Sequence, residues 1–206
     1  MLVETTRFRS VRNAQAALDI TESLENFVHE QESETESETD ALYFAMERSI
    51  VAGDLLQVKK YSKALDMYKE SISCYEDLVS TSIVAAVNAA GCYRNMSTAA
   101  RLMKQYEHGS NYLRQAEALY VRGREALLAH IDQPIVTLDG KTLEDSMNEP
   151  DASMSCSEEV VCLDALIIET LCARSNFHVT YQNDIRQAIE CHEKVLKLLI
   201  HLGPLK

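Results

Sequence analysis

Residues 61 to 79, YSKALDMYKESISCYEDLV, constrain the fold more than any other part of the chain. Apolar side chains recur there every three or four residues, which places them on one face of an α-helix. Most of the charged side chains fall on the other side, where a helix meets water. The apolar positions are Tyr61, Ala64, Leu65, Tyr68, Ile72, Tyr75 and Leu78. The stretch therefore predicts an amphipathic helix.

The same spacing returns further along the chain, which indicates an internal repeat. Near the C-terminus it is formed by Ile185, Ala188, Ile189, His192, Leu196, Leu199 and Leu202. A weaker copy between them has Leu113, Ala116, Tyr120 and Leu127 in register. In that copy Glu117 and Arg124 stand where the pattern requires apolar groups. Because His192 takes the place that Tyr68 has in the first copy, we expect it to be a packed core histidine.

The composition favours an all-α fold. Six glycines and three prolines in 206 residues are too few for a sandwich or barrel with many tight turns. A formal net charge of -12 disfavours general binding to nucleic acid or to an anionic membrane, and favours a basic protein partner. No apolar run approaches the roughly 20 residues that cross a bilayer, and the N-terminus lacks the apolar core of a secretory signal. We therefore expect no membrane insertion, and a location in the cytoplasm or the nucleus.

The order of segments predicts seven helices. We expect an N-terminal helix within residues 1–29, an acidic linker over 30–40, and a helical repeat domain over 41–206. The linker has no apolar side chain, so it is predicted to be either a solvated spacer or a site of phosphorylation at its Ser and Thr residues. Residues 131–157 hold two prolines and little helical period, which predicts a loop insertion. Helices of the repeat domain are expected at about 41–58, 61–78, 82–105, 111–130, 157–178 and 184–202.

Several of these boundaries depend on single residues. Ser80 or Ser82 is expected to cap the third helix of the repeat domain, and Ser157 to begin the helix after the loop. Gly109 and Ser110 are expected to break the chain before the fourth helix. The third helix is rich in alanine, which lets neighbouring backbones approach closely, so we expect it at the centre of the array.

No pattern of catalytic or ligand-binding residues emerges from the sequence. The glycines are scattered, so no phosphate-binding loop is predicted. None of the six cysteines forms a CxxC pair, and we expect them to be reduced core residues rather than ligands of a metal. No strand-turn-helix elbow presents a serine nucleophile. The sequence therefore predicts neither an enzyme nor a cofactor.

The spacing of small and aromatic residues resembles the tetratricopeptide repeat. That family places small residues at the eighth, twentieth and twenty-seventh positions of a 34-residue unit and an aromatic residue at the twenty-fourth. Here these positions match Ala52, Ala64, Tyr68 and Ser71. Ala116, Tyr120 and Gly123 match in a second unit, and Ala188 and His192 match in a third. The resemblance implies an irregular α-α superhelix of antiparallel helix pairs, a solenoid with protein-binding grooves.

A second resemblance covers residues 41–125, which are similar to a three-helix microtubule-interacting-and-trafficking domain. It rests on YSKALDMY in the second helix and NYLRQAEAL in the third, and implies binding of short helical tails in membrane trafficking.

Three functions follow as expectations. The first is a scaffold or adaptor that binds a peptide or a partner helix in a groove between helical repeats. Its candidate groove residues are Arg48, Asn88, Asn95 and Arg101. The alternatives are a trafficking-domain-like binder of helical tails and a self-associating subunit, possible as a homodimer because open arrays expose apolar ends.

Overall fold

The computed structural model describes residues 38–80, 82–131 and 151–202. These residues form α-helices and one short π-helical turn, and no strand occurs among them. The predicted N-terminal helix, most of the acidic linker and residues 132–150 lie outside the described residues. The elements are α3 (Glu38–Gln57), α4 (Tyr61–Glu76), α5 (Ile83–Leu102), α6 (Tyr106–Ile131), α7 (Asp151–Phe177), η4 (His178–Gln182) and α8 (Ile185–Leu202). The predicted all-α class is confirmed for this part of the chain.

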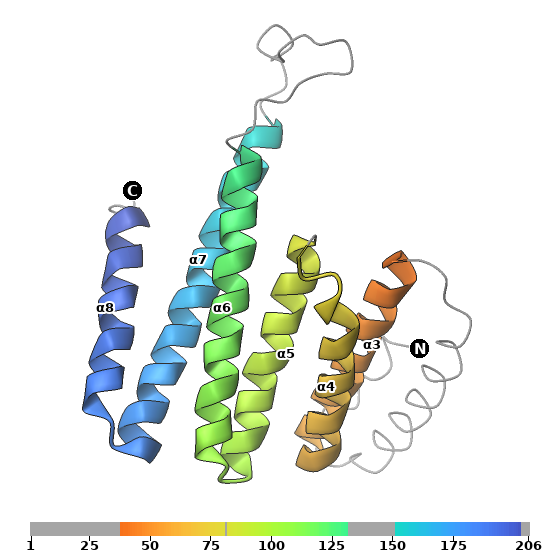
Figure 1. Ribbon diagram of the computed structural model, residues 1–206, viewed down its shortest axis with the longest axis vertical. Helices are drawn as coiled ribbons and strands as arrows, with labels where there is room; N and C mark the ends of the chain where they lie inside the picture. Colours follow the sequence, from red (N-terminus) through yellow and green to blue (C-terminus); the bar gives the residue numbers. More distant parts are fainter. Residues whose placement is uncertain (1–37, 81, 132–150, 203–206) are drawn as a thin grey trace, which may run out of the picture.

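The helices lie side by side in chain order, from α3 at one end of the row to α8 at the other (Figure 1). Each helix packs against the next one along the chain, and α3 also touches α5. At the far end, α8 packs chiefly on α7 and η4. Inner helices therefore have neighbours on two sides, whereas α8 has a close neighbour on one side.

The hydrophobic core forms two clusters that share α5. One cluster joins α3, α4 and α5, and the other joins α5, α6, α7 and α8. Small side chains of α5 are buried in both clusters. Ala85 and Ala89 belong to the first cluster, and Ala90 belongs to the second. The prediction that the alanine-rich helix lies at the centre is confirmed, because small side chains let helices pack closely on both of its sides.

The amphipathic pattern of α4 is confirmed. Ala64, Leu65, Tyr68, Ile72 and Tyr75 are all buried, and Leu78 is buried just beyond the helix end. The next helix begins as predicted, since the side-chain oxygen of Ser82 accepts a hydrogen bond from the Ala85 amide at 3.2 Å. That bond satisfies one of the free N–H groups at the start of α5.

The predicted break at Gly109 and Ser110 is wrong. Both residues lie inside α6, which begins at Tyr106, and the break falls instead at residues 103 to 105. There Lys104 adopts a left-handed conformation with φ 60°, and the Gln105 amide donates to the Ala100 carbonyl at 2.8 Å. This geometry ends helices and usually employs glycine, so a lysine in its place gave no sequence signal.

The predicted start of the helix after the loop is also wrong. This helix, α7, begins at Asp151 rather than near Ser157, so residues 151 to 157 of the predicted loop are helical. Pro150 precedes Asp151 directly in the sequence. A proline before the helix and an acidic residue in its first turn both favour a helix start at this position.

The prediction that the apolar face of the last helix packs in the core is wrong. Of the six positions whose side chains are described, Ala188 is buried, while Ile185, Ile189, His192, Leu196 and Leu199 are exposed. The buried face of α8 instead consists of Ala188, Cys191 and Val195, with Leu198 half-buried. The reason is the position of α8 at the end of the row, because a face can be buried only where another element covers it.

Candidate functional site

A groove between α6 and α8, with α7 as its floor, combines apolar and cationic side chains. Its volume is about 610 Å³. We call it the basic groove. Its apolar residues are Ala118, Val121, Ile167, Leu171 and Leu198. Its charged residues are Arg114, Glu117, Arg124, Glu125, Arg174, Lys194 and Lys197. Five cations against two carboxylates give this lining a positive balance, although the chain as a whole carries -12.

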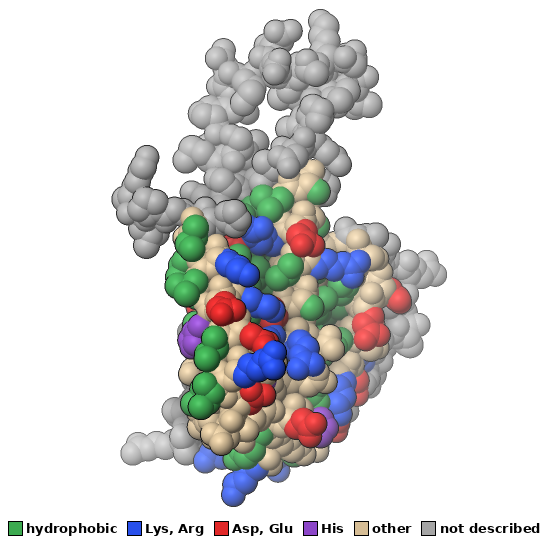
Figure 2. Space-filling view, turned by 60° about the vertical axis from the view of Figure 1, so that its left-hand side comes forward, with side chains coloured by type: hydrophobic (Ala, Val, Ile, Leu, Met, Phe, Trp, Pro, Cys, Tyr) green, Lys and Arg blue, Asp and Glu red, His purple; other side chains and the backbone are tan. Residues whose placement is uncertain are grey.

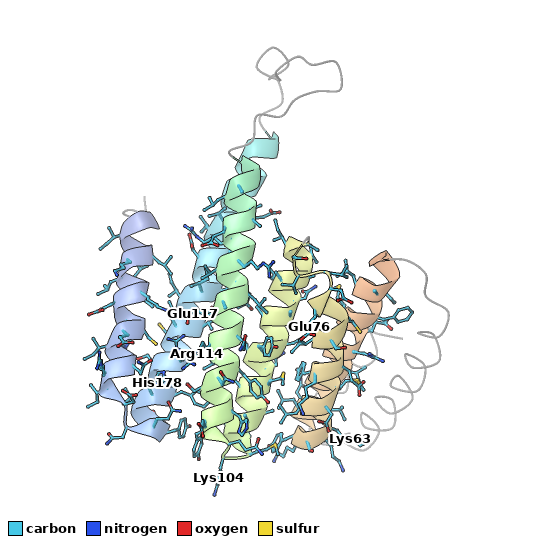
Figure 3. All side chains as sticks on the ribbon, in the orientation of Figure 1. Lys63, Glu76, Lys104, Arg114, Glu117 and His178 are labelled. Carbon is cyan, nitrogen blue, oxygen red and sulfur yellow. The ribbon has the colours of Figure 1, made fainter. Side chains whose placement is uncertain are left out.

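A buried carboxylate organises the middle of the basic groove. Glu117 on α6 accepts hydrogen bonds from Arg174 on α7 and from Lys194 on α8, the latter at 2.5 Å. Arg174 is buried with it, whereas the Lys194 side chain is about half exposed. Figure 3 labels Glu117 on the part of α6 that lies beside α7 and α8. Glu117 therefore links three helices, which explains a carboxylate at a position where the repeat pattern requires an apolar group.

A second buried pair lies nearby. Arg124 Nε donates to Asp164 Oδ1 at 2.5 Å, and Asp164 is 2% exposed. A buried carboxylate is tolerated only when it is paired and hydrogen-bonded. The pair joins residues that are forty positions apart, so neither partner could be assigned from helical spacing alone.

Two cations of the basic groove have no counterion of their own. Arg114 and Lys197 are exposed, and within the described part of the chain neither forms an ion pair. They stand on α6 and α8, on the two walls of the groove. Figure 2 shows Lys and Arg side chains interleaved with acidic ones on the face where α8 comes forward. The groove can therefore attract negative charge at its edge and accept apolar side chains at its floor.

The four groove residues expected from the sequence do not share one groove. Arg48 is buried between α3 and α4, where its Nη1 lies 3.6 Å from Cys74 Sγ and its Nε lies 4.0 Å from a Glu70 carboxylate oxygen. Asn95 is exposed on α5.

Asn88 and Arg101 lie on the opposite side of the row, between α5 and α7. Asn88 lines an apolar depression of about 540 Å³, and Arg101 lines a polar one of about 340 Å³. Arg94 on α5, which also lines the polar depression, forms an ion pair with Glu169 on α7 at 3.0 Å. Asn88 and Arg101 thus line depressions between α5 and α7, two of the helices expected to form the groove. Arg48 instead packs between helices.

A π-helical turn connects α7 to α8. Its first residue, His178, is 4% exposed, and neither ring nitrogen has a hydrogen-bond partner among the described residues. It lines a polar groove of about 940 Å³ together with Ser110, Asp184 and others. Asn183 adopts a left-handed conformation with φ 53°, and Asp184 Oδ1 then accepts from the Gln187 amide at 3.0 Å. This short sequence of turn and cap reverses the chain into α8.

A serine on α7 and a histidine on α8 are in contact, and this contact joins the two helices. Ser175 Oγ lies 2.9 Å from His192 Nε2, and His192 is exposed rather than packed in the core. Because Ser175 is 1% exposed, its hydroxyl oxygen is not accessible to a substrate. The contact links α7 to α8.

The described cysteines are all free. Cys74, Cys92, Cys162, Cys172 and Cys191 form no disulfide, and burial raises the pKa of the Cys92 thiol to about 11. Within the described residues no cluster of His, Cys, Asp and Glu is arranged to hold a metal ion. None of the helices described here is long and apolar enough to cross a membrane.

No family model, curated protein or solved structure matches this chain. The basic groove is therefore assigned from its own geometry and charge.

Proposed function

We propose that the chain is a protein-interaction module that binds an acidic, amphipathic segment of a partner protein in the basic groove. The observation that carries this proposal is the pairing of an apolar floor with the cations Arg114 and Lys197, which are not neutralised within the described residues. Apolar anchors of the ligand would gain about 25 cal/mol for each Å² that they bury. Its carboxylates would fix orientation and speed association.

This proposal changes the expected charge of the partner. The net charge of the chain acts at long range and favours basic partners, but salt screens that field over about 10 Å. At contact distance the partner meets the lining of the groove, where cations outnumber carboxylates. We therefore propose an acidic ligand segment on a partner of any overall charge.

The scaffold is proposed to be a tetratricopeptide-like solenoid of the helix pairs α3/α4, α5/α6 and α7/α8. The positions that match the repeat in the first unit support it, because Ala52, Ala64, Tyr68 and Ser71 are all fully buried. The hydroxyl of Ser71 donates to the Ala45 carbonyl at 2.6 Å, so a small residue at this position holds α4 against α3. The alternative, a three-helix trafficking domain over residues 41–125, has less support, since these residues belong to four helices.

The test is selection from a displayed peptide library on the purified full chain. Peptides enriched on the chain are expected to combine carboxylates with apolar residues at helical spacing. Arg114→Glu together with Lys197→Glu should lower the affinity for such a peptide by tenfold or more, as fluorescence anisotropy can measure. High salt should weaken binding to the unchanged chain, because the contact is partly electrostatic.

Arg122→Glu is the matched control. Arg122 is an exposed arginine on α6 that does not line the groove, so the same change of charge there should leave peptide affinity within about twofold. The proposal fails if the selected peptides are basic, or if the control variant loses as much affinity as the groove variant.

A further inference from the structure

The outer face of α8 carries a regular apolar stripe that nothing in the described structure covers. Ile185, Ile189, Leu196 and Leu199 are 63%, 53%, 58% and 47% exposed, and His192 lies between them. We call these five residues the exposed seam. Their spacing is four, three, four and three, an average of 3.5 residues, which is the repeat that keeps one helix against another over its whole length. Figure 2 shows hydrophobic side chains in a column along the edge where α8 faces the viewer.

The internal repeat indicates that a helix is the kind of element that would cover the exposed seam. Leu65, Ile72 and Tyr75 of α4 occupy the positions that Ile189, Leu196 and Leu199 occupy in α8. In α4 these residues are buried in the cluster that includes α5, the next helix of the row. In α8 no described helix takes the corresponding place (Figure 1). The exposed seam therefore matches the surface that another helix would cover.

We propose that a second copy of the chain covers the exposed seam, with the two α8 helices packed antiparallel about a two-fold axis. Such an interface requires a surface that is complementary to itself. The exposed seam meets this requirement, because two apolar residues lie on each side of His192. An antiparallel pair brings the first half of one seam against the second half of the other.

The charged residues beside the seam fix the register. Setting Ile185 opposite Leu196 of the second copy also sets Ile189 opposite His192, and it leaves Leu199 beyond the start of the second copy's α8. Arg186 and Glu193 each follow a seam residue directly, so they flank the seam on the same side. In this register Arg186 of one copy lies beside Glu193 of the other, and the contact occurs twice. A parallel pair would instead bring each of these residues level with its own copy, as like charges.

The charges are available for such contacts. The Arg186 side chain is 89% exposed and its contact to Glu190, at 3.4 Å, lies within the same helix. Glu193 is exposed and has no ion-pair partner in the described portion of the protein.

The dimer is expected to be weak and to strengthen with salt. One helix from each copy contributes less than the roughly 800 Å² per partner of a standard stable interface. Each copy carries a formal charge of -12, so the copies repel at low salt. Salt screens this repulsion and leaves apolar burial intact. This response is opposite to that expected for peptide binding in the basic groove.

Sedimentation velocity of the full chain tests the proposal, over a wide range of concentration at low and at high salt. The unchanged chain is expected to shift from monomer to dimer with rising concentration, at lower concentrations when salt is high. Leu196→Glu should abolish the dimer and leave the monomer folded, because the side chain is 58% exposed. Val161→Glu is the control, since Val161 is 53% exposed on α7, and it should leave the dimer unchanged.

Charge reversal tests the antiparallel register. Arg186→Glu and Glu193→Arg should each weaken the dimer, and the two changes together should restore it. A monomer at every concentration overturns the proposal, including the case in which another segment of the same chain covers the seam. A dimer that survives Leu196→Glu overturns it as well, and a dimer that the double reversal fails to restore overturns the register.

Discussion

Glycine 109 shows how the role of one residue depends on its neighbour in space. It lies inside α6, where glycine is usually unfavourable because the unfolded chain has more freedom to lose. A Cβ at this position would lie 2.6 Å from Cε1 of Phe177, a buried ring at the end of α7. The glycine therefore permits close contact between the two helices. Gly91, in α5, has no such neighbour, since its nearest contact would be Tyr120 Oη at 4.0 Å.

The two glycines should respond oppositely to the same substitution. Gly109→Ala is expected to destabilise the fold by about 1–3 kcal/mol, because Phe177 must move. Gly91→Ala is expected to stabilise it by up to about 1 kcal/mol through helix propensity. Urea denaturation of both variants measures the difference. Equal effects of the two substitutions would show that Phe177 does not constrain position 109.

The buried ion pair of Glu117 and Arg174 allows a second prediction for single residues. Glu117→Leu should cost about 3–5 kcal/mol, because it leaves the buried Arg174 guanidinium without its carboxylate. Glu117→Leu combined with Arg174→Met should recover most of that loss, since an apolar pair of similar volume can replace a buried ion pair. Thermal or urea unfolding of the single and double variants measures this coupling. A double variant that loses the sum of the two single effects would contradict it.

At the scale of the element, α4 and α8 carry the same apolar pattern and meet different surroundings. In α4 the pattern is buried because α3 and α5 pack on both sides. In α8 the pattern turns partly outward, and Cys191 and Val195, which lie outside it, form the buried face with Ala188. Periodicity thus identifies an amphipathic helix, but the direction in which the helix faces depends on how many neighbours it has.

Equivalent substitutions in the two helices should therefore differ. Leu65→Ala should cost about 2–5 kcal/mol, because Leu65 is 6% exposed and its loss leaves a cavity. Ile189→Ala should change the unfolding free energy of the monomer by less than about 0.5 kcal/mol, as expected for an exposed position. The comparison is made by urea denaturation at concentrations where the chain is monomeric. A large loss for Ile189→Ala would mean that the same chain already covers this position.

At the scale of the whole molecule, buried acidic groups link stability to alkaline pH. Burial raises the pKa of Tyr68 and Tyr75, and it raises the pKa of the Cys92 thiol from 9.0 to about 11. A raised pKa means that the folded state favours the neutral form. The contribution to stability is complete below the unfolded pKa and is lost as the pH rises through the folded one.

The urea midpoint should therefore be constant near neutral pH and fall between pH 9.0 and about 11. Tyr68→Phe should reduce this fall, because it removes one group that must ionise in a buried place. Its effect at neutral pH should be small, since the Tyr68 hydroxyl has no hydrogen-bond partner in the described structure. A midpoint that stays constant over this range would show that these groups are accessible to water.

The whole molecule also presents two proposed surfaces with opposite responses to salt. The basic groove attracts an acidic segment and should bind more weakly as salt rises. The exposed seam is apolar and joins two acidic copies, so it should pair more strongly. Arg114→Glu should weaken peptide binding and leave the dimer unchanged, and Leu196→Glu should abolish the dimer and leave peptide binding unchanged, which keeps the two proposals separable.

The sequence by itself determined the elements that depend on neighbours along the chain. Helical spacing predicted α4 and the alanine-rich α5. A serine before the apolar run, Ser80 or Ser82, predicted the start of α5, and Ser82 is the one that caps it. These features follow from hydrogen bonds and contacts within a few residues.

Only the tertiary structure decided the features that join distant residues. It paired Glu117 with Arg174 and Arg124 with Asp164, and it placed Gly109 against Phe177. It also decided which face of α8 is buried, since that depends on α7 lying on one side and on no described helix lying on the other. The basic groove is also a feature of this kind, because its walls come from α6 and α8. No local sequence pattern indicates that two helices far apart in the sequence form one surface.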